Sequence, residues 1–201
     1  MTLTVGVMVK ETHSKAQLGS VDDLEAFERI YEDHAEAIFR HAFYLLGHHE
    51  DADDVKQETF LRAYRALHSF RRESSVRTWL RKICSNLCYD RLKRNRQQRE
   101  LLCEPEEAQR ALVLLSTEVT GDPLTDPQAA LDRADTLRLL LCALQGLPPP
   151  QRNVIVLHVL EGLDYREIGE ILGCAPGSAK MRVLRATQLF RERVKAMGVG
   201  R

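Results

Sequence analysis

Apolar side chains recur every three or four residues through most of this 201-residue chain, and no stretch alternates as a strand does. Between residues 21 and 47 the recurring apolar positions are Leu24, Phe27, Tyr31, Ala35, Ile38, Ala42 and Leu45. Ser20 and Asp23 resemble a capping box in front of them, and Gly47 is the residue type that ends a helix. The pattern therefore predicts a helix that runs to Gly47.

Two more helices follow in the same pattern. One starts near Asp51 and carries the apolar residues Val55, Phe60, Leu61, Tyr64 and Leu67. Ser74 or Ser75 can cap the other, whose inner face holds Val76, Trp79, Leu80, Ile83, Cys84, Leu87 and Cys88. We expect these three helices to form one domain over residues 21–95, preceded by a loosely ordered tail over residues 1–20.

Proline, glycine and acidic residues dominate the next stretch, which we interpret as a flexible linker over residues 96–130. Asp126 and Pro127 resemble an N-cap and first helical residue, which predicts a helix ending at Gly146. The segment "LPPPQRNVIVLHVLEG" restarts a helix that ends at Gly162. The fold prediction is thus all-α, with a second helical domain over residues 131–197.

The end of the chain, "LDYREIGEILGCAPGSAKMRVLRATQLFRERV", carries the most specific local pattern. Asp164 and Glu167 form a capping box for a short helix, and Gly173 stands where a left-handed residue ends it. Gly177 and Ser178 then start another helix. Two helices joined by so short a turn indicate a helix-turn-helix, whose second helix can enter the major groove of DNA.

The second helix of this motif has two distinct faces at 100° per residue. Its predicted core side is Ala179, Val183, Ala186, Phe190, Val194 and Met197. Its predicted outward side is Met181, Leu184, Arg185 and Gln188, flanked by Lys180 and Arg182. A helix that reads DNA needs base-reaching side chains outward and phosphate-neutralising bases beside them. The alternative is an ordinary amphipathic helix with a solvated basic face.

Charge is segregated along the chain although 29 acidic and 29 basic residues cancel overall. Residues 20–55 and 100–150 are acidic, whereas residues 69–99 hold ten Arg and Lys against Glu73 and Asp90. A one-signed cluster indicates a polyanionic partner. The acidic blocks lead to the hypothesis that the free protein binds DNA weakly.

The helix in this basic stretch carries its charges on both sides of the apolar arc. Arg77 and Arg81 lie on one shoulder, and Lys82, Asn86 and Lys93 lie on the other. Basic and amide groups in this arrangement suit single-stranded nucleic acid, where bases can stack or be hydrogen-bonded. Trp79 lies on the apolar side, which favours a core position over a role as a stacking platform.

Five cysteines without metal-finger spacing or a secretory leader favour a reduced, cytoplasmic protein, and no apolar run reaches the ~20 residues of a membrane span. Cys84 and Cys88 could form a redox or metal site, but small buried apolar side chains are the favoured interpretation. His48 and His49, in "GHHEDADD", could bind a metal ion, but a solvated loop is favoured because no tetrahedral spacing is present. We predict no cofactor and no metal site.

Two stretches resemble a known family in its order and spacing. "DADDVKQETFLRAYRALHSFRRESSVRTWLRKICSNLCYDRLKR" looks like region 2 of the extracytoplasmic-function (ECF, group IV) sigma factors of bacterial RNA polymerase. "LPPPQRNVIVLHVLEGLDYREIGEILGCAPGSAKMRVLRA" looks like their region 4. The resemblance implies promoter-specific transcription initiation, with core polymerase (β′ clamp and β flap), promoter DNA and an anti-sigma factor as partners.

The resemblance also implies three binding surfaces. The surface that docks on the β′ clamp would consist of Asp51, Asp54, Gln57, Glu58, Phe60, Leu61 and Arg65. The opened strand of the −10 element would contact Arg71, Arg72, Ser74, Ser75, Arg77, Trp79, Lys82, Asn86 and Lys93. The −35 duplex would contact Ser178, Lys180, Met181, Arg182, Leu184 and Arg185. Arg72 and Met181 depart from the family's pattern, so the preferred bases do not follow from it.

Two other functional classes compete with this interpretation. A self-sufficient regulator would bind duplex DNA as a dimer without polymerase, but it leaves the pattern of residues 51–94 unexplained. An enzyme acting on nucleic acid would need a phosphate-binding loop, paired acids or a nucleophile motif, and the sequence has none of these. No catalytic residue is predicted, and the sequence identifies neither the promoters, nor the inducing signal, nor the anti-sigma factor.

Overall fold

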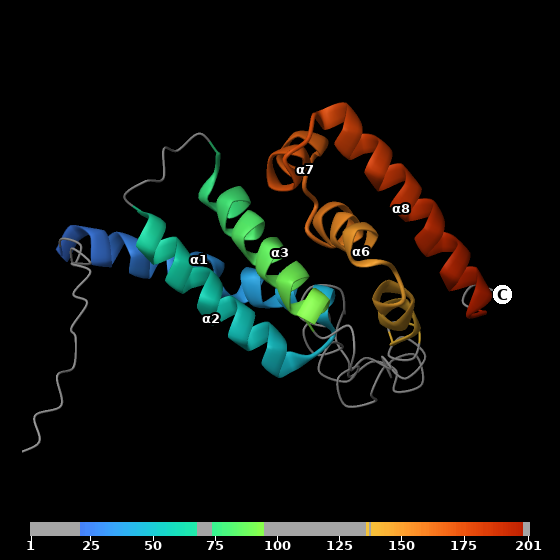
Figure 1. The fold of residues 1–201 in the computed structure, drawn as a ribbon, viewed down its shortest axis with the longest axis horizontal. Coiled ribbons are helices and arrows are strands. Elements are labelled where there is room, and N and C mark those ends of the chain that lie inside the picture. Colours follow the sequence, from blue (N-terminus) through green and yellow to red (C-terminus); the bar gives the residue numbers. More distant parts are fainter. Residues whose placement is uncertain (1–20, 68–73, 95–135, 137, 199–201) are drawn as a thin grey trace, which may run out of the picture.

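A computed structural model of the chain describes residues 21–67, 74–94, 136 and 138–198, and all regular secondary structure in this part is helical (Figure 1). The helices are α1 (Val21–Leu46), α2 (His49–Ala66), α3 (Val76–Arg94), α6 (Pro149–Ile155), the π-helix η3 (Val156–Leu160), α7 (Tyr165–Leu172) and α8 (Pro176–Ala196). Residues 138–145 are helical as well. The predicted all-α fold is thereby confirmed. None of the described helices has the length and apolar character of a membrane span.

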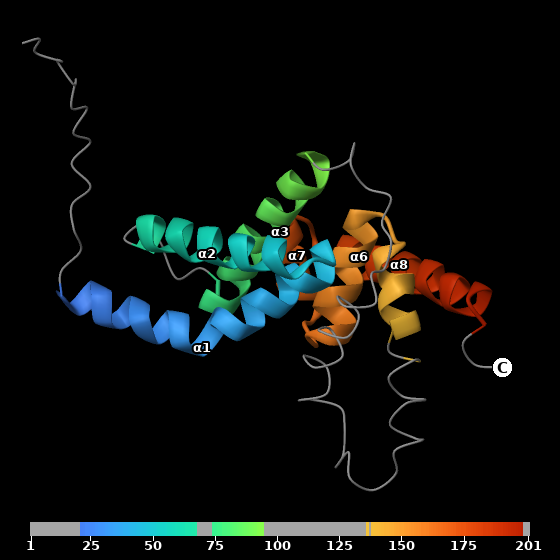
Figure 2. The same ribbon diagram turned by 90° about the horizontal axis from the view of Figure 1, so that it is seen from below.

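Helices α1, α2 and α3 pack side by side around one core (Figure 2). Its buried side chains include Ile38, Ala42, Leu45, Val55, Phe60, Ala63, Leu80, Cys84 and Leu87. Leu24 and Tyr31 were expected on the buried stripe of α1 but are 48% and 42% exposed. The reason is length: α1 has 26 residues against 18 and 19 in its partners, so its first turns extend past them.

The starts of α2 and α3 differ in how they are capped. Helix α2 begins at His49, two residues before the expected start, and its N-cap His48 makes no side-chain hydrogen bond. Helix α3 begins after Ser75, whose hydroxyl oxygen accepts the backbone N–H of Thr78 at 3.1 Å. Ser75 is therefore the capping residue, as one of the two predicted alternatives had it. Ser20, the other predicted cap, lies outside the described residues.

The predicted helix that restarts after Gly146 is present and changes its geometry along the way. Pro149 opens α6, where its fixed φ suits the first turn. The chain then widens into the π-helix η3, which the sequence pattern did not predict, and Glu161 forms its C-cap. Gly162 follows with φ of 67°, a left-handed value that glycine adopts without strain. The predicted end at Gly162 is confirmed.

The predicted helix-turn-helix is formed by α7 and α8. The carboxylate of Asp164 accepts the N–H groups of Arg166 and Glu167 at 2.8 Å each, and Glu167 accepts the N–H of Asp164 at 3.0 Å. Gly173 ends α7 with φ of 62°. Helix α8 begins at Pro176, one residue before the expected start.

Only part of the predicted core stripe of α8 is buried. Ala179, Val183 and Ala186 are buried and Phe190 is half-buried, but Met197 is 39% exposed. Val194 is still half-buried, and Met197 follows it as the C-cap of α8. Burial on this side of α8 thus decreases towards the end of the helix.

The two halves of the described chain pack against each other. Helix α3 contacts α7 and α6, and α1 contacts η3 and α6 (Figures 1 and 2). Buried apolar residues of both halves form one continuous core. The sequence predicted two helical units on a tether and did not predict this contact between them.

Candidate nucleic-acid interface

The outward face of α8 matches the sequence prediction. Ser178, Lys180, Met181, Arg182, Leu184 and Arg185 are all exposed. Met181 and Leu184 are about half exposed, so both side chains are accessible to a partner. Arg182 and Arg185 also line a cavity of about 400 Å³ that faces Tyr89 of α3.

The outer side of α3 carries the second predicted DNA surface. Lys82, Asn86 and Lys93 are exposed on one side of the helix. Trp79 is half-buried and packs against the core, as its apolar position favoured. Arg71 and Arg72 lie outside the described residues.

The residues predicted to dock on polymerase lie on α2 and differ in their exposure. Asp54, Gln57, Leu61 and Arg65 are exposed, and Asp51 and Glu58 are half-buried. Phe60 is only 4% exposed because its ring packs against the aromatic rings of α1. Phe60 therefore packs in the core between α1 and α2, and its side chain is not part of the exposed surface of α2.

An arginine of α3 orders the acidic end of this surface. The guanidinium of Arg91 donates hydrogen bonds to Asp51 at 2.5 and 3.0 Å and to Asp54 at 3.1 Å. The carboxylates of Asp51 and Asp54 raise the pKa of Arg91. The position of the acidic groups on α2 is thus tied to α3.

The cysteines lie in different environments. Cys84 and Cys88 are buried free thiols in the core between α1, α2 and α3, and burial raises the pKa of Cys88 well above its ordinary value. Cys142 is disulfide-bonded, so the expectation of reduced cysteines is wrong for this residue. Spacing along the chain does not reveal which cysteines the fold brings within bonding distance. Among the described residues, no group of His, Cys, Asp and Glu side chains could hold a metal ion.

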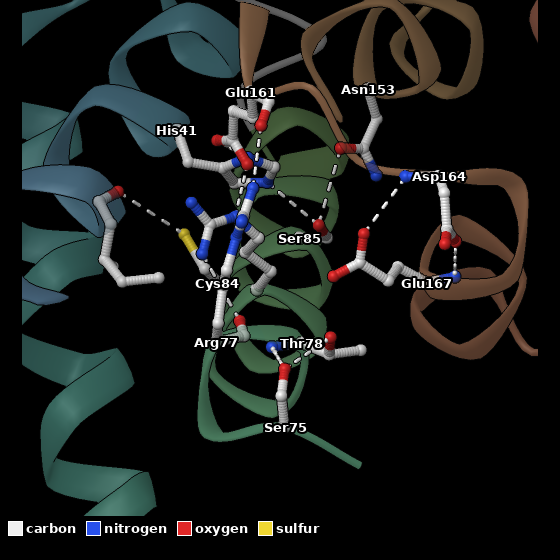
Figure 3. Close-up of polar contacts among 12 residues, drawn as sticks. His41, Ser75, Arg77, Thr78, Cys84, Ser85, Asn153, Glu161, Asp164 and Glu167 are labelled. Carbon is white, nitrogen blue, oxygen red and sulfur yellow. Dashed lines mark hydrogen bonds and ion pairs between the residues drawn. The ribbon is translucent and has the colours of Figure 1, made fainter. Parts of the chain in front are cut away.

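A buried ionic cluster joins the two halves of the molecule (Figure 3). Glu161, at the end of η3, bonds to His41 Nδ1 of α1 at 2.8 Å and accepts a hydrogen bond from Nε of Arg81 of α3. The other ring nitrogen of His41 lies 3.0 Å from the hydroxyl of Ser85. Arg77 donates to the carbonyl oxygen of Glu161 at 2.7 Å. We name His41, Arg77, Arg81 and Glu161 the interdomain cluster.

Burial and charge oppose each other at this cluster. Burial lowers the pKa of His41, but the charge and hydrogen bond of Glu161 outweigh it and raise that pKa above its ordinary value, with Cys84 adding to the rise and Arg81 opposing it. Burial likewise raises the pKa of Glu161, and His41 and Arg81 outweigh it, so the net pKa is lowered. The carboxylate and the imidazolium therefore stabilise each other's charged forms.

The sequence placed Arg81 on one shoulder of the apolar arc of α3, and it did not predict that this side chain is buried. Only 4% of Arg81 is exposed, because η3 covers that side of α3 and supplies the Glu161 carboxylate. His41 and Glu161 were not among the predicted site residues at all. The signal that could have found His41 is its position among the apolar residues of 38–46, where a polar side chain needs a buried partner.

Two more buried polar residues support the contact. The guanidinium of Arg152 donates to the carbonyl oxygens of Leu45, Gln145 and Leu147 and, at 2.6 Å, to the Gln145 side chain. Asn153 donates to the hydroxyl of Tyr89 at 2.8 Å. Both residues lie in α6, so this helix is fastened to α1 and α3 by hydrogen bonds as well as by apolar packing.

Comparison with known proteins identifies the two halves. A sigma-70 region 2 model matches residues 30–98, and a sigma-70 region 4 model matches residues 137–189. The chain is 33% identical over 173 residues to the ECF RNA polymerase sigma factor SigE of Mycolicibacterium smegmatis, over 84% of this chain and 62% of that protein. It is 30% identical over 153 residues to the ECF RNA polymerase sigma-E factor of Haemophilus influenzae, over 73% of this chain and 76% of that protein. This chain belongs to the ECF RNA polymerase sigma factors.

A solved structure supports the same assignment for the fold. The sigma factor RpoE from Bartonella quintana, in complex with the anti-sigma factor NepR, matches with a TM-score of 0.60 and 27% sequence identity. The match covers 88% of this chain and 99% of that one. In this sigma factor, α1–α3 are therefore the helices of region 2, and α6, η3, α7 and α8 belong to region 4.

Proposed function

We propose that this protein is a group IV sigma factor that binds core RNA polymerase and directs it to promoters with its own −10 and −35 elements. The observation that carries the proposal is the exposed face of α8, the second helix of the helix-turn-helix. Basic and apolar side chains lie together on this face. We place region 2 at residues 21–95, the linker at 96–130 and region 4 at 131–197.

Region 4 binds the −35 element as duplex DNA in this proposal. Lys180 and Arg182 neutralise phosphates, while Met181, Leu184 and Arg185 reach base edges in the major groove. The first turn of α8 follows an N-cap without a side-chain hydrogen bond, so its backbone N–H groups can bind a DNA phosphate.

Region 2 binds the opened −10 strand. Lys82 and Lys93 attract the backbone and Asn86 hydrogen-bonds a base, since all three are exposed on one side of α3. Ser75 is engaged in capping α3, which leaves Ser74 and the preceding loop for base capture. Trp79 then acts through the core and orients the helix.

Core polymerase docks on the exposed side of α2, through the β′ clamp, and the β flap contacts region 4. Asp54, Gln57, Leu61 and Arg65 form the docking surface, and Arg91 orders its acidic end. An anti-sigma factor controls the protein in the cytoplasm, which is supported by the similarity to an RpoE solved with an anti-sigma factor. The protein supplies binding energy, and the polymerase carries out the chemistry.

Promoter-dependent transcription with reconstituted holoenzyme tests this proposal. Arg185→Ala should lower initiation from a cognate promoter by roughly 5–150-fold, since a good base contact is worth about 1–3 kcal/mol. Arg191→Ala is the control, because Arg191 is also exposed on α8 but lies beyond the predicted recognition face. Equal activity of the two variants would contradict the assignment of Arg185 to the recognition face. Tight operator binding without polymerase would favour a self-sufficient regulator.

A further inference from the structure

The interdomain cluster holds more positive than negative charge. His41 and Arg81 contact the carboxylate of Glu161, and Arg77 donates to the backbone carbonyl oxygen of the same residue, so three basic side chains gather around one acidic residue. The side chains of His41, Arg81 and Glu161 are at most 10% exposed. Buried charges are stable only when they are paired, so one carboxylate leaves this group short of negative charge.

A small cavity lies beside the cluster. Its volume is about 180 Å³, and its lining includes Arg77, Arg81 and Glu161. The Nε atom of Arg77 is buried there and has no hydrogen-bond partner. The field of these arginines also reaches His34, whose pKa is lowered by burial and by the charges of Arg81 and Arg77. Planar guanidinium groups gathered around a small polar cavity suit a phosphate group.

The cluster lies at the start of the helix proposed to hold the −10 strand. Arg77 and Arg81 occupy its first two turns, directly after the loop proposed to capture a base. Glu161 comes from region 4, and among the described residues it is the carboxylate that pairs with both Arg81 and His41. The anion on this part of region 2 is therefore supplied by the other domain (Figure 3).

We propose that Arg77, Arg81 and His41 form a phosphate-binding site for the promoter strand, and that Glu161 occupies it as an internal anion while the two domains are packed together. The inference rests on the proposed function of region 2, and it adds that region 4 competes with the promoter strand for this site. DNA and region 4 cannot hold the site at once, so strand binding requires region 4 to move away. The free protein then binds DNA weakly because of one carboxylate, and not only because of its overall charge pattern.

The test compares Glu161→Gln with Glu170→Gln. Both substitutions remove one negative charge from region 4, but Glu170 lies on the exposed side of α7 and pairs only loosely with Arg166, at 3.8 Å. The measurements are binding of a fluorescent single-stranded oligonucleotide of random sequence to the full-length free protein at several salt concentrations, and the radius of gyration by small-angle scattering. Random sequence suffices because phosphate contacts carry no sequence information.

Glu161→Gln should increase the radius of gyration and tighten oligonucleotide binding by roughly tenfold, within the 5–150-fold range typical of coupled sites. Its salt dependence should become steeper by about 0.7 in log–log slope for each phosphate gained. Glu170→Gln should leave both unchanged. Adding Arg81→Gln to Glu161→Gln should return the slope towards that of the wild type, which a general loosening of the domains would not do.

Three results would overturn the inference. One is that Glu161→Gln neither opens the molecule nor changes oligonucleotide binding. Another is that it opens the molecule but leaves the affinity and the salt slope as in the wild type. The third is that inorganic phosphate, replacing chloride at equal ionic strength, opens the wild-type protein without DNA, which would assign the site to free phosphate. The proposed function is judged separately, by promoter-dependent transcription of the wild-type holoenzyme.

Discussion

Gly169 sets how closely the two helices of the helix-turn-helix approach each other. It lies inside α7, and a Cβ atom at this position would be 2.6 Å from the carbonyl oxygen of Cys174 in the turn. The backbone N–H of Cys174 in turn donates to the carbonyl oxygen of Gly169 at 2.9 Å. The obstacle to a side chain is thus backbone held by a hydrogen bond, which cannot rotate away.

Gly169→Ala brings two opposing effects. Alanine favours the helix by up to about 1 kcal/mol over glycine. The added methyl group, however, overlaps the Cys174 carbonyl, and overpacking of this kind costs typically about 1–3 kcal/mol. We expect the overlap to dominate and to lower the free energy of unfolding by about 1–2 kcal/mol. In a chain of this size that corresponds to roughly 2–8 °C in the melting temperature.

Gly177→Ala is the matched control. It makes the same substitution in the first turn of α8, where a Cβ atom would meet nothing within 4 Å. Only the helix preference remains there, so the melting temperature should stay the same or rise. Differential scanning calorimetry of both variants decides the matter, with binding to duplex DNA as a second readout. A Gly169→Ala variant as stable as Gly177→Ala would refute the argument from close approach.

Three further predictions concern the contact between the domains and the surface of α2. Arg152→Met leaves the buried carbonyls that Arg152 binds without a donor and should lower the free energy of unfolding by at least about 1–3 kcal/mol, the cost of one buried unsatisfied group. Arg62→Met, at an exposed ion pair, should cost at most about 0.5 kcal/mol. Similar urea midpoints for the two variants would contradict this. Asp54→Lys should weaken co-elution with core polymerase while circular dichroism stays unchanged. The raised pKa of His41 means that its share of the domain contact is complete below its ordinary value of 6.5 and is lost as pH rises through the raised pKa. The radius of gyration should therefore increase as the pH is raised through the pKa of His41, and Glu161→Gln should remove this dependence.

Local interactions account for what the sequence determined by itself. The boundaries of α7 are set by its capping box, Asp164 and Glu167, and by the left-handed Gly173. All three residues lie in or next to this short helix, so the sequence pattern alone locates the helix-turn-helix. The outward face of α8 follows from helical periodicity in the same way. These features depend on hydrogen bonds and side-chain spacing inside one or two turns, which is the information a sequence displays directly.

Only the tertiary structure decided which polar residues are buried and which ends of the helices lack a partner. The position of Arg81 on a shoulder of the apolar arc did not reveal its burial, because its partner Glu161 lies 80 residues away. His41 and Glu161 are 120 residues apart and meet only because η3 packs on α1. Leu24 and Tyr31 show the converse: periodicity gives the side of a helix, but the length and position of the neighbouring helices decide where along that side burial begins and ends. Long-range contacts between separate amphipathic surfaces leave no periodic signal in the chain, so the packing of region 4 against region 2 could be seen only in three dimensions.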